Sequence, residues 1–189
     1  MDIIFATHNL NKVCELRKLL KENNCNYNIL SLDDLKCKVE VIETGTTFKE
    51  NSLLKAKAIY EIYKIPVLAD DSGLCVDALD GAPGIFSSRY SGGSSSDNID
   101  LLLKNMENID NRDAHFNCTV CYYDSNPNFF EGIVQGEIGY KRVGQSGFGY
   151  DPIFMYEDKS FAAISLDDKN KISHRAKALK KFLSYIYNN

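Results

Sequence analysis

The chain has 189 residues, of which 44% are hydrophobic and 25% charged, values typical of a globular protein with a sizeable core. Its formal net charge of −4 argues against a general nucleic-acid-binding surface. No apolar run approaches the roughly 20 residues that a membrane helix needs, and the first is too short for a signal peptide. We therefore expect a cytoplasmic protein with neither nucleic acid nor a membrane as a partner.

Hydrophobic spacing along the chain predicts a single α/β domain, residues 1–189, built on a mixed sheet. The spacing of Thr47 and Glu50 fits a capping box at the start of a helix. The Gly-, Pro- and Ser-rich stretch 73–93 predicts a long ordered loop. Strands are expected at 2–7, 27–32, 39–42, 66–70, 116–123, 129–138, 153–156 and 161–164, and helices at 12–22, 48–63, 97–105 and 173–187.

Six cysteines are scattered through the chain, and two of them, Cys118 and Cys121, form a CxxC. This pair suggests zinc binding or redox chemistry, but no second CxxC completes a zinc site. The pair lies in a strand-like run, where an offset of three residues points side chains to opposite faces. The favoured interpretation is therefore two buried structural thiols.

The stretch ATHNLNK, residues 6–12, places a polar turn between a strand and a helix. The first amides of a helix lack internal partners and carry partial positive charge, which suits a phosphate group. The alternative is that Asn11 only caps the helix and Lys12 is solvated.

Two further polar positions precede and follow the start of the helix at 48–63. Glu43 lies in a Thr-Gly loop before it, and Asn51 and Lys55 are four residues apart, so they share one helix face. A turn residue and a solvated lysine are the plainer interpretations.

The last helix opens with an unusual charge pattern. Ser173 is a good N-cap, but His174 and Arg175 follow at once, and Lys169 and Lys171 precede it. Cations at a helix N-terminus oppose the macrodipole, and an anionic ligand would resolve the conflict. An accident of the surface is the alternative.

The stretch SGFGYDP, residues 146–152, flanks Phe148 with glycines before Tyr150 and Asp151. The glycines allow a flat ligand to approach the backbone while an aromatic ring stacks on it, and Asp151 offers hydrogen-bond acceptors. A turn carrying a core phenylalanine is the alternative.

The stretch LADDSG, residues 68–73, sets two carboxylates side by side where we expect a strand to end. Alternation along a strand makes Asp70 and Asp71 diverge, so they should not play identical roles. Mg²⁺ prefers oxygen ligands and takes one or two carboxylates from a protein. Otherwise, one aspartate caps a turn and the other pairs with a lysine.

Taken together, these features fit a nucleoside polyphosphate bound with Mg²⁺. The ordered motifs ATHNLNK, ETGTTFKENSLLKA, ADDSGLCVDALDGAPGIFSSRYSG, GFGYDPIF and SHRAKAL closely resemble the inosine triphosphate pyrophosphatases, over nearly the whole chain. That family usually has a glycine in its opening turn, where this chain has His8. The resemblance implies Mg²⁺-dependent hydrolysis of ITP, dITP or XTP to the monophosphate and pyrophosphate. It also implies an elongated mixed β-sheet with flanking helices, two lobes around a central cleft, and a homodimer.

The resemblance also implies roles for individual residues. Asp71 would be the proton acceptor, with Lys55 and Lys12 on phosphate oxygens, and Glu43, Asp71 and Asp70 would hold Mg²⁺. The substrate would be contacted by Thr7, His8, Asn9, Leu10, Asn11, Lys12, Ser72, Phe148, Gly149, Tyr150, Asp151, Lys169, His174 and Arg175.

Two other functions compete with this one. A non-catalytic sensor of purine triphosphates would bind nucleotides without releasing pyrophosphate. A pyrophosphatase for modified pyrimidine nucleotides would share the reaction but should lack the Ser-His-Arg motif at 173–175.

Overall fold

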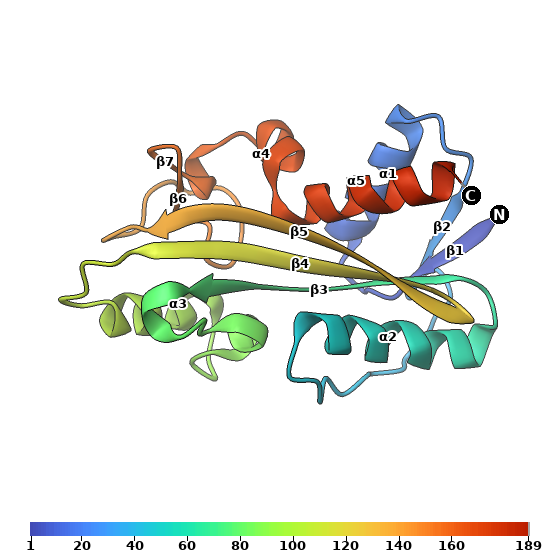
Figure 1. The fold of residues 1–189 in the computed structure, drawn as a ribbon, viewed down its shortest axis with the longest axis horizontal. Coiled ribbons are helices and arrows are strands. Elements are labelled where there is room, and N and C mark those ends of the chain that lie inside the picture. Colours follow the sequence, from blue (N-terminus) through green and yellow to red (C-terminus); the bar gives the residue numbers. More distant parts are fainter. Residues whose placement is uncertain (189) are drawn as a thin grey trace. The chain divides into compact units, whose positions relative to one another are not determined.

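The computed structural model describes residues 1–188, without the side chains at 166, 167 and 170. It confirms the predicted mixed α/β class, with a seven-stranded sheet in the order β2-β1-β3-β4-β5-β6-β7 and flanking helices (Figure 1). β1 runs parallel to β2 and β3, whereas β6 is antiparallel to β5 and β7. The strands are β1 Asp2–Phe5, β2 Asn28–Ser31, β3 Val67–Val76, β4 Asp113–Asp124, β5 Asn126–Ile138, β6 Phe154–Tyr156 and β7 Lys159–Ser160. The α-helices are α1 Leu10–Glu22, α2 Phe48–Tyr63, α3 Ser95–Asn105, α4 Leu166–Ile172 and α5 His174–Tyr187.

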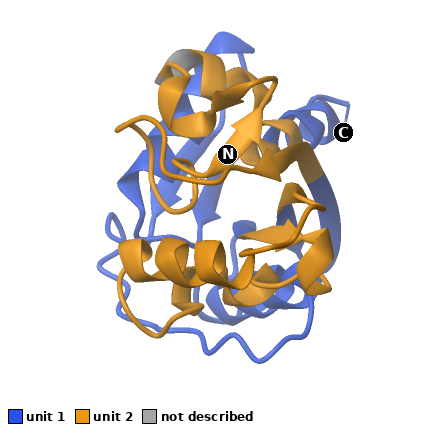
Figure 2. Cartoon of the chain, turned by 90° about the vertical axis from the view of Figure 1, so that its left-hand side faces the viewer, with its two compact units in different colours: residues 1–71, 118–131, 178–189 blue, residues 72–117, 132–177 orange. Residues whose placement is uncertain are grey.

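The chain divides into two compact units, coloured separately in Figure 2. Unit 1 comprises Met1–Asp71, Cys118–Glu131 and Ala178–Asn189. Unit 2 comprises Ser72–Asn117 and Gly132–Lys177. The boundary at Asp71 and Ser72 falls inside β3, in the middle of the LADDSG stretch.

In unit 1, successive side chains along a strand point alternately into two apolar cores. Ile3 and Phe5 of β1 pack with α1 and with the part of α5 in this unit, whereas Ile4 between them packs with α2. In β3, Leu68 joins the first core and Ala69 the second. This is the two-residue period of a strand that is covered on both faces.

The same alternation decides the outcome for the CxxC pair. Cys118 and Cys121 are both fully buried, but Cys118 lies in the core under α1 and α5 and Cys121 in the core under α2. Both are free thiols, and burial raises the pKa of Cys121 to about 12. The predicted pair of structural thiols on opposite faces is confirmed.

The bounds of α2 agree with the sequence prediction. Thr47 is the N-cap, and its side chain accepts a hydrogen bond from the Glu50 amide at 3.1 Å. The Glu50 carboxylate accepts from the amide of Thr46 at 2.6 Å, one residue earlier than a standard capping box would use. These two hydrogen bonds join the end of the loop to the first turn of α2.

Unit 2 has its own core, which joins α3 to the strand segments around it. Phe116, Phe154 and Phe161 pack against one another with ring centroids 4.6–6.0 Å apart. At the start of α3, Ser94 and Asp97 form a complete capping box. These contacts build the base on which the 144–151 loop and α4 lie.

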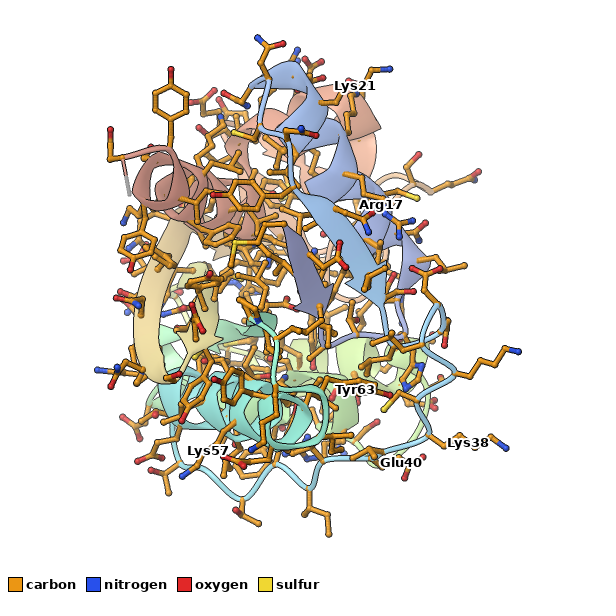
Figure 3. All side chains as sticks on the ribbon, turned by 90° about the vertical axis from the view of Figure 1, so that its right-hand side faces the viewer. Arg17, Lys21, Lys38, Glu40, Lys57 and Tyr63 are labelled. Carbon is orange, nitrogen blue, oxygen red and sulfur yellow. The ribbon has the colours of Figure 1, made fainter. Side chains whose placement is uncertain are left out.

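Three predicted elements are wrong. Residues 39–42 form no strand; the segment is an exposed connector, with Ile42 80% exposed and Lys38 and Glu40 pointing outward (Figure 3). β3 does not end at Asp70 but continues to Val76, so the predicted loop begins later. Residues 161–163 form a turn of 3-10 helix, not a strand, and α4 follows where no helix was predicted.

The described helices include none that is both long and apolar enough to cross a membrane.

Candidate active site

The two adjacent aspartates of β3 point to opposite faces of the strand and meet different lysines. Asp70 continues the alternation of Leu68, on the side of α1, and accepts two hydrogen bonds from Lys12 Nζ at 3.0 and 2.9 Å. The Asp70 side chain is 2% exposed and that of Lys12 22%. Strand geometry therefore gives Asp70 a partner 58 residues away on the helix that covers its face.

Asp71 continues the alternation of Ala69, on the side of α2. There, Lys55 Nζ lies between two carboxylates, 2.8 Å from Glu43 Oε1 and 3.2 Å from Asp71 Oδ1. Burial alone would lower the pKa of Lys55, but the charges of Asp71, Asp70 and Glu43 outweigh it and the pKa is raised. Lys55 is therefore a firmly charged ammonium group between acidic side chains.

Asp71 differs from its neighbour in having one unused oxygen. Its Oδ2 is buried and has no hydrogen-bond partner among residues 1–188. Burial raises the pKa of Asp71 and the nearby Glu43 charge adds to this effect, whereas Lys55 opposes them. A buried carboxylate with a raised pKa and an available lone pair has the properties of a general base.

The predicted metal ligands are divided between two lysines. Glu43 and Asp71 share Lys55, whereas Asp70 pairs with Lys12. Among residues 1–188, no group of three or more His, Cys, Asp or Glu side chains is arranged to hold a metal ion. The carboxylates of Glu43 and Asp71 are nevertheless hard-oxygen donors of the kind that fits Mg²⁺.

The turn before α1 is exposed and held by its own side chains. Asn9, not Asn11, is the N-cap of α1: its side chain accepts from the Asn11 amide at 3.0 Å. The Asn9 amide is bonded to Thr7 Oγ1 at 3.1 Å. His8 does not have a positive φ, so it fits this turn without left-handed strain, and its Nδ1 lies 2.6 Å from Asp33 Oδ1.

In unit 2, the 144–151 loop closes on a buried ion pair. Lys169 pairs with Asp151, and the same Asp151 oxygen accepts from the Phe148 amide at 2.8 Å. Lys169 Nζ also lies 4.8 Å from the centroid of the Phe148 ring, which is a cation–π contact. Gly147 is required here because a Cβ would lie 2.2 Å from Asp151 Oδ2.

The aromatic residues of this loop have different surroundings. The Phe148 side chain remains exposed, as a stacking platform requires, whereas Tyr150 belongs to the core. The Tyr150 hydroxyl donates to the Ser87 carbonyl at 2.9 Å, and burial raises its pKa. A ligand could therefore contact the backbone of Tyr150 but not its buried ring.

The basic residues at the start of α5 are buried. His174 and Arg175 are each 7% exposed, which excludes an accident of the surface. The His174 ring stacks on Phe116 at 4.8 Å, and Ser173 caps the helix by accepting from the Ala176 amide at 3.2 Å. Three predicted contacts remain: Ser72 lies half-buried in β3 directly after Asp71, Leu10 is exposed at the start of α1, and Gly149 has a positive φ of 58°.

Sequence reasoning assigned no role to three residues that contact predicted site residues or face them. Asp33 holds His8 and Phe116 supports His174 across distances in sequence that no local pattern reveals. The spacing of Asn51 and Lys55 on one helix face could be read from the sequence, but the contacts that the Asn51 side chain makes could not.

Known proteins resemble this chain over almost its whole length. The model of the Ham1 family matches residues 3–185. A dITP/XTP pyrophosphatase of Leptospira interrogans is 43% identical over 191 residues, covering 97% of this chain and 96% of that protein. A dITP/XTP pyrophosphatase of Bacillus licheniformis is 43% identical over 188 residues, with 95% of each covered.

Solved structures extend the likeness to the fold. A HAM1 protein from Coxiella burnetii superimposes with a TM-score of 0.94 at 33% identity, covering 100% of both chains. The Staphylococcus aureus Ham1 protein gives a TM-score of 0.92 at 36% identity, covering 100% of this chain and 99% of that one. With a family model that spans almost its whole length and relatives above 40% identity, this chain belongs to the Ham1 family.

Proposed function

We propose that the chain is a Mg²⁺-dependent pyrophosphatase that hydrolyses ITP, dITP and XTP to the nucleoside monophosphate and pyrophosphate. The names of the relatives support the reaction and the substrate class. The observation that carries the proposal is Asp71, a buried carboxylate with a raised pKa and one oxygen without a partner among the described residues. A nucleotide sensor would not need such a group.

In this mechanism, Asp71 accepts the proton of the attacking water, while two lysines bind phosphate oxygens. Hydrogen bonds to Asp70 fix the position of the Lys12 ammonium group. Hydrogen bonds to Glu43 and Asp71 fix that of Lys55. An ammonium group has three N–H donors. Each lysine therefore keeps a donor for the triphosphate, and fixed charges of this kind stabilise the transition state of phosphoryl transfer.

Glu43 and Asp71, with Asp70 as a further carboxylate, would hold the metal. Bound there, Mg²⁺ supplies charge neutralisation on the phosphate oxygens and on the leaving pyrophosphate. The fit rests on the hard-oxygen donors that these carboxylates supply.

The residues of unit 2 are proposed to recognise the base. The exposed Phe148 ring would stack on the purine, with Gly149 and the Tyr150 backbone beside it. Lys169, His174 and Arg175 would donate hydrogen bonds to the 6-oxo group that distinguishes hypoxanthine and xanthine from adenine. A site built from donors rejects the amino group of adenine strongly because its buried donors are left unpaired.

The proposal includes a homodimer and a cytoplasmic setting, both on the resemblance to the family.

The test is pyrophosphate release from ITP, dITP, XTP, ATP and GTP, each measured with Mg²⁺ and with excess EDTA. We expect the first three to be cleaved far faster than ATP and GTP, and only with Mg²⁺. Release of no pyrophosphate from any of the five would favour a sensor or the related pyrimidine pyrophosphatase. Equal rates for all five nucleotides would reject the proposed specificity.

A further inference from the structure

Asn51 is a fully buried polar residue on α2, one helical turn before Lys55. Its Oδ1 accepts a hydrogen bond from the amide of Gly45 at 2.8 Å. The reversed orientation would place the side-chain NH2 group against the Gly45 N–H, donor against donor. The contact with Gly45 therefore fixes the direction in which the Asn51 amide nitrogen points.

The loop that carries Glu43 packs closely onto Asn51. A Cβ on Gly45 would lie 2.6 Å from Glu50 Cβ and 2.7 Å from Asn51 Oδ1, so only glycine allows this approach. Glu43, two residues earlier, reaches Lys55 on the same helix face. Asn51 and Lys55 thus form two successive contacts between this loop and α2, one to its backbone and one to its carboxylate.

The nitrogen of the Asn51 side chain has no partner among the described residues, and neither has one oxygen of Asp71. Asn51 Nδ2 and Asp71 Oδ2 are both buried and lack hydrogen-bond partners anywhere in residues 1–188. Asn51 lies one helical turn before Lys55, and Lys55 contacts the other Asp71 oxygen, so Asn51 lies on the face of α2 that meets Asp71. An unsatisfied donor and an unsatisfied acceptor, near each other and buried, are costly unless they are used together.

We propose that Asn51 is a positioning residue for the hydrolysis reaction, holding the Glu43 loop with its oxygen and orienting the Asp71 carboxylate with its amide N–H. Lys55 contacts one Asp71 oxygen, and the other oxygen, like the Asn51 amide nitrogen, has no partner among the described residues. The carboxylate plane is then set from both sides, and the lone pair that receives the proton points in one direction at each turnover. The inference rests on the proposed function and adds a residue to it that does not touch the substrate.

The test separates the loop contact from the orienting contact. Asn51→Asp keeps the shape and an oxygen for the Gly45 amide but removes the N–H donor, and Asn51→Ala removes both. Asn98 supplies the matched control because it also lies four residues after a helix N-cap and clamps the preceding loop. Its Oδ1 accepts from Ser91, and its Nδ2 donates to the Ser88 carbonyl at 3.2 Å, so both ends are satisfied.

Initial rates of pyrophosphate release from ITP are measured with Mg²⁺ for wild type, N51D, N51A and N98D, normalised to the folded fraction from circular dichroism. We expect kcat to fall about 10- to 100-fold in both Asn51 variants, the usual size of an effect on the support of a metal or catalytic ligand. The KM for ITP should stay within about threefold of wild type. N98D should lose melting temperature while its kcat stays within about threefold.

Three results would overturn the inference. The first is a kcat within about threefold of wild type in either folded Asn51 variant. The second is an equal loss of kcat in N98D. The third is failure of both Asn51 variants to fold, which would make Asn51 purely structural. A wild-type chain that releases no pyrophosphate would instead refute the proposed function, and the role of Asn51 with it.

Discussion

Asp70 and Asp71 are adjacent and chemically identical, yet their surroundings predict different effects on stability when each is changed to asparagine. Asp70→Asn removes one of two charges from a pair that is held by bonds of 3.0 and 2.9 Å. Breaking a fully buried pair costs about 3–5 kcal/mol. Lys12 is 22% exposed and regains some water, so we expect about 2 kcal/mol. For a chain of 189 residues, this corresponds to a fall of about 4–8 °C in melting temperature.

Asp71→Asn should cost less stability than Asp70→Asn, although the NH2 group of the new asparagine would stand where the Asn51 N–H is proposed to donate. Lys55 keeps its 2.8 Å bond to Glu43, and the asparagine oxygen can still accept the weaker 3.2 Å bond. Burial raises the pKa of Asp71, so its ionisation destabilises the fold as the pH rises through that raised pKa. At pH 7, the substitution removes this cost, while it should abolish ITP hydrolysis because the proton acceptor is lost.

Thermal unfolding of the two variants and wild type, followed by circular dichroism at pH 7 in EDTA, measures the difference directly. EDTA keeps metal binding from contributing to the melting temperatures. Equal losses in both variants, or a melting temperature of D70N equal to that of wild type, would refute the assignment of the two aspartates to different faces. Near-normal turnover by D71N would refute its catalytic role.

Two further predictions concern the fold. Gly136→Ala should lower the free energy of unfolding by about 1–3 kcal/mol because its Cβ would lie 2.4 Å from the Met155 carbonyl. Gly139→Ala should be nearly neutral because its nearest neighbour is the flexible Met155 side chain at 3.3 Å. Similar melting temperatures for the two variants would contradict this. In the native protein at pH 8, iodoacetamide should alkylate the exposed Cys14 and spare Cys121, whose pKa is raised to about 12, as peptide mass spectrometry can check. Labelling of both thiols at the same rate would show that Cys121 is accessible.

The features that could be predicted from sequence are those that depend on a local period. The two-residue period of a strand placed Cys118 and Cys121 on opposite faces, and the same period separated Asp70 from Asp71. The bounds of α2 followed from its cap. These patterns need no knowledge of the rest of the chain.

The errors arise where pairing with distant segments decides the structure. Ser72 and Gly73 are typical of a turn, but β3 has β1 and β4 as its neighbours in the sheet and continues to Val76. Residues 39–42 have the composition of a strand, yet the segment joins no sheet in the described chain. Strand propensity does not supply a neighbour to pair with.

The sequence predicted which residues form the site, but it did not predict which lysine pairs with which carboxylate. Which lysine meets which aspartate depends on the helix that covers each face of β3, and Lys12 and Asp70 are 58 residues apart. The role of Asn51 depends on an orphaned donor and acceptor that only the packed structure reveals. Sequence spacing identified its helix face and nothing more.

In the proposed mechanism, the alternation of β3 lets two adjacent aspartates take part in one reaction without competing. Had both side chains met the same lysine, each carboxylate would have raised the pKa of the other. Instead, α1 supplies Lys12 to both oxygens of Asp70, which fixes a cation on one face of the strand. On the other face, Lys55 occupies only one oxygen of Asp71, and the second keeps the lone pair that a base requires. An Asp-Asp pair in an extended strand therefore yields one carboxylate suited to hold a lysine and one suited to accept a proton, and exchanging their roles would require exchanging the helices that cover the two faces.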